Sequence, residues 1–399
     1  MKKIINVIYC FLFIAFLSLV GCQDTAKQKN TSDKKNQNTA VDSNTIATNI
    51  IAEPVQNLPE QFYKRLEGDV SGEKMVIHLI RTDTFLRGTF FSKQEKHAFF
   101  NTESTINKQG IVKITAYNEN DDSQIGMAGM FDGKFLNTAT LKGSWQATES
   151  AVKSNFLLTE KYEKGSVQLD VIHFEKQLDC DEDKACATMK LHFPKVRKAG
   201  NKKLANAINA TINKNLLEML NELATNPDEA DANSIETATA AFFDSFGEDG
   251  EPYGQMWSNE IDWDIYYNRH SILSFGLNKY YYTGGAHPNY MSLHFNFDLN
   301  KGEKIKLDDL FEGDYETLLL KLAEKELRLQ QDIPANAPLS DFIFETELTL
   351  NENFYISSEG ITFVYDPYEI APYAVGTITL PIAFKDIKKI IKKDGLLGK

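Results

Sequence analysis

The sequence contains few cysteines and no recognisable catalytic motif. Its seven histidines include no HExxH pair, and no serine lies in a GxSxG context. His287 and His294 are seven positions apart and would need a carboxylate from elsewhere in the fold to bind a metal. We therefore expect no catalytic residue, no metal and no other cofactor, and we predict that the protein is not an enzyme. A hydrolase built from residues that the sequence does not group together is the alternative.

Positive charge is also scarce. The chain has 43 Lys and Arg against 56 Asp and Glu, a formal net charge of -13 at pH 7. A net acidic exterior argues against nucleic acid and against anionic lipid surfaces as partners, and it favours a basic partner. Solubility alone is the simpler reason for such a charge.

The chain begins with a basic and then an apolar segment. Lys2 and Lys3 precede an apolar run from Ile4 to Val20, which is the pattern of a secretory signal peptide. The run ends in the letters LVGC, which resemble the lipobox of bacterial lipoproteins. We predict a signal peptide over residues 1–21 and a lipid anchor on Cys22, which would place the mature protein in the cell envelope, outside the cytoplasm. An ordinary signal peptide before an unrelated cysteine is the alternative.

The segment that follows is polar. Residues 22–58 are rich in Asn, Thr, Lys, Asp and Gln, and they contain no aromatic residue. Such a composition cannot bury enough apolar surface to offset the entropy lost on ordering. We predict a disordered stalk that holds the folded part at a distance from the bilayer.

The remaining cysteines indicate a local crosslink. Of four cysteines, Cys10 leaves with the signal peptide and Cys22 carries the lipid, so Cys180 and Cys186 remain. In an oxidising compartment, two cysteines six positions apart favour a disulfide that closes a loop. A zinc site is the rival interpretation, but it needs about two more ligands at suitable spacing.

Residues 59–163 read as a series of short alternating strands separated by turn residues. Many short strands at regular spacing predict a small antiparallel β-barrel or meander. Such a barrel is either filled by its own side chains or holds a small apolar ligand. The segments are KMVIHLIR, LRGTFFS, HAFFNTES, IVKITAYN, IGMAGMFD, ATLKGSWQA and SNFLLTEK.

The sequence from 164 to 399 predicts an α+β domain of antiparallel sheet with packed helices, in two halves near 164–255 and 256–399. In the first half a strand pair brackets the cysteine segment. Apolar residues at helical intervals then predict helices over 201–224 and 234–246.

The second half returns to strands. EIDWDIYY and SILSFGLNKYYY predict a hairpin. The alternation from Met291 to Leu299 predicts a strand with one buried and one solvated face, with His294 on the solvated face. Asp314 is expected to cap a helix whose inward stripe includes Leu329. The C-terminal KDIKKIIKK is expected to be helical.

Three segments of this half resemble a known family. YYTGGAHPNY, FNFDLNKGEKIKLDDLF and FYISSEGITFVYDPYEIAPYAVG are similar to the extracellular domain shared by RsiV-type anti-sigma factors and PdaC-type peptidoglycan deacetylases. The resemblance covers about residues 165–395. It implies a recognition module, since RsiV-type proteins recognise lysozyme outside the membrane. We expect this chain to lack both the sigma-factor-binding segment and the deacetylase domain of those proteins.

The segment from 280 to 290 supplies the candidate site. Its glycines permit backbone angles closed to other residues, and tyrosines in rigid loops supply contact area at low entropic cost. The functional interpretation is one exposed surface that this loop forms together with the later DPYEIAPYAVG segment. The structural interpretation is a loop that only joins two strands, with His287 bonded to backbone. The candidate residues are Tyr282, Gly284, Gly285, His287, Asn289, Tyr290, Tyr368, Glu369 and Tyr373.

These observations predict a lipid-anchored envelope protein whose α+β module binds a macromolecule. The partner is either a basic protein such as lysozyme or fragments of peptidoglycan. Two alternatives belong to other classes. One is a cell-wall glycan hydrolase or deacetylase of unrecognised type, and the other is a barrel that carries a small apolar ligand.

Overall fold

The N-terminal strands close on themselves in a computed structural model of the chain. Strands β1–β4 and β6–β9 form a ring of antiparallel neighbours, in which β1 pairs with β9 and β2 pairs with β3. The short β5 lies between β3 and β6. This eight-stranded ring confirms the predicted barrel. Its strands are β1 (Gln61–Val70), β2 (Glu73–Thr82), β3 (Phe85–Ser92), β4 (Ala98–Phe100), β5 (Thr105–Ile106), β6 (Ile111–Glu119), β7 (Ile125–Asn137), β8 (Thr140–Ala147) and β9 (Ser154–Glu160).

The structure describes only part of the chain. The predictions for residues 1–52, which include the signal peptide, Cys22 and most of the stalk, lie outside the described residues, as does Cys180. Residues 53–399 form one compact unit. The described residues are 55, 57–70, 72–92, 98–100, 103–119, 125–148, 150–178, 186–200, 202–222, 233–249 and 256–398.

Aromatic rings fill the barrel interior. The Phe131 ring lies 4.3 Å from that of Trp145 and 5.3 Å from that of Phe90, and its centroid is 5.7 Å from that of Phe156. All four side chains are at most 5% exposed. This dense packing favours a barrel filled by its own side chains over one that carries a ligand.

A six-stranded sheet follows, in the order β10-β11-β12-β13-β14-β15. The expectation of a wholly antiparallel sheet is wrong at one place, because β11 and β12 are parallel. Helices α1 (Lys202–Glu222) and α3 (Ile235–Asp249) lie between these two strands in the chain, and a parallel pair needs such a long crossover. The strands are β10 (Gln168–Leu178), β11 (Cys186–Lys198), β12 (Met256–Arg269), β13 (Ile272–Tyr282), β14 (Asn289–Asp298) and β15 (Glu303–Lys304).

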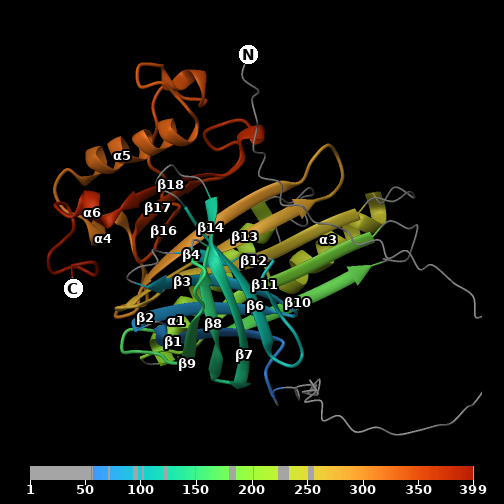
Figure 1. Cartoon of the computed structure of the whole chain (residues 1–399). Helices are drawn as coiled ribbons and strands as arrows, with labels where there is room; N and C mark the ends of the chain where they lie inside the picture. The colour runs from blue at the N-terminus through green and yellow to red at the C-terminus, as the bar shows by residue number, and fades with distance from the viewer. Residues whose placement is uncertain are drawn as a thin grey trace, which may run out of the picture. The chain divides into compact units, whose positions relative to one another are not determined.

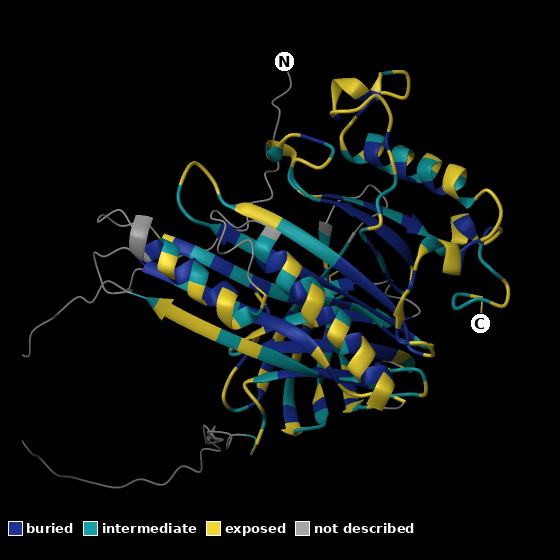
Figure 2. Ribbon diagram, turned by 180° about the vertical axis from the view of Figure 1, so that it is seen from behind, coloured by how far each residue is buried: buried dark blue, intermediate teal, exposed yellow. Residues whose placement is uncertain are grey.

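The two helices cover one face of this sheet, as Figure 2 shows from behind. They confirm the predicted helices over 201–224 and 234–246. Ile208, Leu216 and Phe242 of the helices belong to the same buried cluster as Trp263 and Phe275 of the strands. The opposite face carries polar side chains of the sheet, and the barrel strand β3 and a smaller C-terminal sheet pack against parts of it.

A smaller sheet completes the fold (Figure 1). Its three antiparallel strands are β16 (Phe354–Ile356), β17 (Gly360–Tyr365) and β18 (Ile378–Ala383). Helix α5 (Tyr315–Gln330) packs on β18. The remaining helical turns are α4 (Leu307–Leu310), η1 (Leu339–Asp341), η2 (Tyr373–Val375) and α6 (Phe384–Ile387). No helix among the described residues is long and apolar enough to cross a membrane.

Two local predictions for this half are wrong, and a third, the cap at Asp314, is confirmed in position only. Leu329 is 47% exposed, because the buried stripe of α5 runs through Leu319, Ala323 and Leu327. Asp314 occupies the N-cap position, but its side chain makes no capping hydrogen bond. The C-terminal lysine-rich segment forms only the single turn α6 and then continues as turns packed on α4.

The prediction for His294 is also wrong. The face of β14 expected to be solvated is covered by the β16–β18 sheet, so His294 is 8% exposed. Its ring bonds the Asn353 side chain at 3.0 Å and lies beside Tyr355. Burial lowers the pKa of His294 to about 4, so the ring is neutral at pH 7.

Candidate functional site

The two loops singled out in the sequence meet in space. The ring of His287, in the β13–β14 loop, stacks on the ring of Tyr373 with centroids 3.9 Å apart. The Tyr373 hydroxyl also donates to the Pro288 carbonyl at 2.6 Å. Tyr373 belongs to the segment after β17, so a ring contact and a hydrogen bond join segments 85 residues apart in the chain.

The β13–β14 loop is held by its own short-range bonds. Gly284 and Gly285 have φ values of 100° and 89°, which only glycine adopts readily. The Tyr282 hydroxyl donates to the Gly285 carbonyl at 3.1 Å. His287 Nδ1 lies 2.9 Å from the carbonyl of the adjacent Pro288. The His287 bond to backbone thus stays within its own loop, and Tyr373 makes the link between the two loops.

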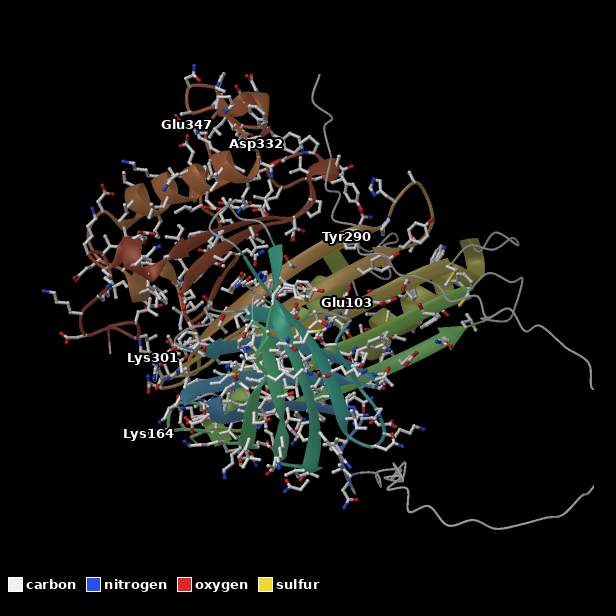
Figure 3. All side chains as sticks on the ribbon, viewed as in Figure 1. Glu103, Lys164, Tyr290, Lys301, Asp332 and Glu347 are labelled. Atoms are coloured by element: carbon white, nitrogen blue, oxygen red, sulfur yellow. The ribbon has the colours of Figure 1, made fainter. Side chains whose placement is uncertain are left out.

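Further tyrosines extend the contact. Tyr368 lies 5.5 Å from Tyr373 between ring centroids, and Tyr280 lies 5.4 Å from Tyr290 in an edge-to-face pair. Tyr368 is 57% exposed and Tyr290 is 36% exposed. Figure 3 shows Tyr290 near the end of the sheet from which the β13–β14 loop projects. We call Tyr280, His287, Tyr290, Tyr368 and Tyr373 the tyrosine surface.

Tyr280 is a member that the sequence analysis missed. Burial, together with the neighbouring Tyr290 and Glu260, raises the pKa of its hydroxyl. Tyr280 is the cross-strand partner of Tyr290. Counting back from the hairpin loop would have placed these two side chains on the same face of the sheet.

Two other candidates have supporting positions. Glu369 accepts from the Asn351 side chain at 2.8 Å and from the Asp366 backbone N–H at 2.9 Å. It therefore fixes the turn that presents Tyr368, whose φ is 71°. Asn289 is exposed at the start of β14 and pairs with Tyr281 across the hairpin.

Asp366 fastens the second loop to the sheet. Its carboxylate accepts from the backbone N–H of Ser292 at 3.0 Å and from the Ser292 hydroxyl at 2.7 Å. Burial, with a smaller contribution from Glu369, raises the pKa of Asp366 to about 6 despite these hydrogen bonds. The carboxylate is therefore partly desolvated where β17 leads into the tyrosine surface.

This pKa gives a pH-dependent stability. Because the folded-state pKa lies above the usual value, the folded protein binds a proton more tightly than the unfolded chain between about pH 4 and pH 6. Raising the pH through that window should lower the free energy of unfolding by roughly 1–3 kcal/mol through this group. Urea denaturation of wild type and Asp366→Asn at pH 4, 5, 6 and 7 measures the difference. If the free energy of unfolding changed equally with pH in the two proteins, this would contradict the assignment.

The face of the large sheet opposite the helices continues the site. Glu260, Asp262 and Asp264 alternate along β12 and share the face opposite the helices. Glu260 is the register partner of Tyr280, which in turn is the partner of Tyr290. The row of carboxylates therefore begins beside the tyrosine surface.

Charge partners distinguish these acids. Arg87 of the barrel lies 2.9 Å from Asp262, and His192 lies 3.1 Å from it. Burial alone would raise the pKa of Asp262, but Arg87 and His192 lower it to about 2. Burial raises the pKa of Asp264, which accepts from Asn278 at 2.8 Å. Asp262 thus joins barrel and sheet, whereas Glu260 lies nearest the tyrosines.

Cations are absent from the segments that form most of the tyrosine surface. Residues 280–300 and 329–384 contain no lysine and no arginine. The second segment carries eight acidic residues: Asp332, Asp341, Glu345, Glu347, Glu352, Glu359, Asp366 and Glu369. Of the acids, Glu369 adjoins Tyr368, and Glu260 on β12 is the register partner of Tyr280. The tyrosine surface therefore combines rings with adjacent carboxylates, which is the chemistry that attracts ammonium and guanidinium groups.

The remaining predicted groups lie elsewhere. Within the described residues, no group of three or more His, Cys, Asp or Glu side chains could hold a metal ion. Cys186 is disulfide-bonded and 9% exposed at the start of β11. Its pairing with Cys180 stays a prediction, because Cys180 lies outside the described residues. The site as it stands offers ring and carboxylate contacts to a ligand.

Comparisons with known proteins identify two segments. The family described as Deacetylase PdaC matches residues 180–290, and the family described as Protein of unknown function (DUF3298) matches residues 308–385. The chain is 29% identical over 138 residues to the peptidoglycan-N-acetylmuramic acid deacetylase PdaC of Bacillus subtilis. That alignment covers 33% of this chain and 29% of the relative, so it spans under a third of the relative's length. These matches confirm the resemblance to PdaC- and RsiV-type domains.

Two solved structures are also similar. A DUF3298 family member from Bacteroides fragilis is 23% identical with a TM-score of 0.46, and the match covers 58% of this chain and 96% of that one. A DUF3298 family protein from Pseudomonas aeruginosa is 20% identical with a TM-score of 0.43, and the match covers 57% of this chain and 94% of that one.

Proposed function

We propose that this chain, which carries a PdaC-type and a DUF3298 domain as PdaC- and RsiV-type proteins do, is a lipid-anchored binding protein of the cell envelope. Its tyrosine surface recognises a basic protein partner of the lysozyme type. The protein binds and does not catalyse a reaction. Cys22 supplies the membrane anchor, and the polar segment that follows it supplies the tether.

One observation supports this proposal most directly. Rings from two loops far apart in the chain lie against one another at an exposed surface whose segments carry acids and no cations. Tyrosine rings attract lysine and arginine side chains by cation–π contact, and the surrounding carboxylates steer a positively charged protein. Prearranged rings also lose little conformational entropy on binding.

Peptidoglycan is the second candidate partner. The Bacillus relative is named for its action on peptidoglycan N-acetylmuramic acid, and stacked rings such as His287 and Tyr373 offer faces to the apolar side of a sugar. A hydrolase or deacetylase activity is the alternative from another class. Incubating the protein with peptidoglycan and assaying released acetate and reducing ends tests that alternative.

The binding proposal is tested with the compact unit, residues 53–399. Titration calorimetry with lysozyme at 50 mM and 300 mM salt should show binding that weakens at least tenfold at the higher salt, because charge steering is screened. Cytochrome c, a basic protein without muramidase fold, is the control for charge alone. Equal affinity for lysozyme and cytochrome c, or no heat of binding at low salt, would exclude a lysozyme-type partner. Soluble peptidoglycan fragments would then be titrated next.

A further inference from the structure

The C-terminal segment presents a row of lysines on a fixed backbone. In KDIKKIIKK the isoleucines point inward, with Ile387 fully buried and Ile390 6% exposed. The neighbouring lysines must therefore point outward. Lys385, Lys388, Lys389 and Lys393 are all exposed.

Backbone contacts hold this segment in place. Ile391 forms a β-bridge with Phe311, and the Glu312 backbone N–H donates to the Ile390 carbonyl at 2.8 Å. The Lys392 N–H donates to the Leu310 carbonyl at 2.9 Å. The ammonium groups thus project from a rigid support, so gathering them against a partner costs little backbone entropy.

The four exposed lysines have no carboxylate partner among the described residues. Within the part of the chain that the structure describes, none of them forms an ion pair, whereas Lys392 donates to the Asp308 carbonyl. Segment 385–394 carries five lysines against Asp386 and Asp394, so its local charge is positive in an acidic protein. Unpaired surface ammonium groups are free to meet an external anion.

A surface depression lies beside the exposed lysines. It has a volume of about 380 Å³ and is bordered by Lys321 of α5 and Lys389 of the tail. Thr317, Leu318 and Ile390 complete its walls together with Asp314, the one carboxylate among them. Two ammonium groups at the border of an open hollow suit the phosphate of a lipid headgroup.

We propose that this lysine face, defined by Lys321, Lys385, Lys388, Lys389 and Lys393, contacts the surface of an anionic phospholipid bilayer. The net charge of the whole chain argues against such a partner, but contact is decided by the local charge within about one Debye length of roughly 8–10 Å. Each lysine near an anionic leaflet contributes about 1 kcal/mol, or about fivefold in affinity.

The predicted anchor favours a bilayer over a soluble anionic polymer. A stalk over residues 22–58 would have a root-mean-square reach of roughly 30–35 Å, so the compact unit would stay close to the membrane. At such high effective concentration, a weak electrostatic contact is sufficient. Figures 1 and 2 place the C-terminal tail and the β13–β14 loop at opposite ends of the molecule's β16–β18 region. Contact through the lysine face would therefore turn the acidic tyrosine surface away from the bilayer.

Vesicle sedimentation tests the proposal on residues 53–399, which contain no lipid anchor. The vesicles are phosphatidylcholine alone or phosphatidylcholine with 30% phosphatidylglycerol, at 50 mM and 500 mM salt. We expect cosedimentation only with the anionic vesicles and only at low salt. The triple variant Lys388→Glu/Lys389→Glu/Lys393→Glu should lower binding at least a hundredfold.

The matched control reverses three exposed lysines of the barrel, in Lys108→Glu/Lys113→Glu/Lys142→Glu. It changes the net charge equally and should lower binding less than tenfold. Equal losses in the two triple variants, equal binding to neutral vesicles, or no binding to either vesicle would overturn the proposal. Retention on a soluble phosphate polymer with no vesicle binding would overturn it in favour of a polymer. None of these outcomes depends on whether lysozyme binds.

Discussion

Replacing Tyr373 with alanine is expected to weaken binding of a lysozyme-type partner by roughly thirtyfold or more. Tyr373 contacts both His287 and Tyr368 and bonds Pro288, so its removal takes away the ring that joins the two loops. Central aromatic residues of an interface commonly cost 2 kcal/mol or more when truncated, which corresponds to about that factor. Calorimetric titration of the variant against lysozyme at low salt measures the change.

Two control variants separate the causes. Tyr373→Phe keeps the ring contacts and loses only the hydrogen bond to the Pro288 carbonyl, so it should stay within about threefold of wild type. Tyr117→Ala removes a barrel tyrosine that also stacks on a neighbour and bonds a side chain, and it should leave affinity unchanged. A Tyr373→Ala protein that binds as wild type does would show that the loops are only structural. An equal loss in Tyr117→Ala would point to altered folding instead.

The sequence predicted local structure best where its apolar residues repeat with a single helical or strand period. The helical spacing of Ile208, Ile212 and Leu216 predicted α1, and the alternating short segments predicted an antiparallel barrel or meander, of which the structure shows the barrel. Strand direction was not predictable in the same way. A strand buried between helices and a neighbouring sheet shows no period that tells a parallel from an antiparallel partner, so the β11–β12 pair was missed.

The alternation of apolar and polar residues did not predict burial where a segment distant in the chain packs over a strand. The alternation of β14 correctly gave two faces, but β16, about sixty residues later, covers the one that carries His294. The same kind of long-range packing brings Tyr373 onto His287. The family resemblance placed both loops in one domain, and only the fold shows that they touch. Tyr280 begins the segment 280–290 and was still missed, because its position opposite Tyr290 depends on the register of the hairpin.

Replacing Phe131 with alanine is expected to lower the free energy of unfolding by about 3–5 kcal/mol. The ring is 1% exposed and contacts Phe90, Trp145 and Phe156, so its loss leaves a cavity that these neighbours cannot fill without leaving their rotamers. Urea denaturation followed by tryptophan fluorescence measures the change. The control is Met130→Ala, which truncates the adjacent side chain on the outside of the barrel, where it is 44% exposed, and should cost less than about 1 kcal/mol.

The same variant tests whether the barrel carries an apolar ligand. A barrel whose interior is filled by rings has no room for benzene, so benzene should not raise the unfolding midpoint of wild type. The cavity left by Phe131→Ala is lined by aromatic carbon and should stay dry, so benzene should recover part of the lost stability there. A rise in wild type equal to that in the variant would mean that the interior already accommodates a ligand. The barrel would then need a function of its own, since packing alone would no longer account for its aromatic lining.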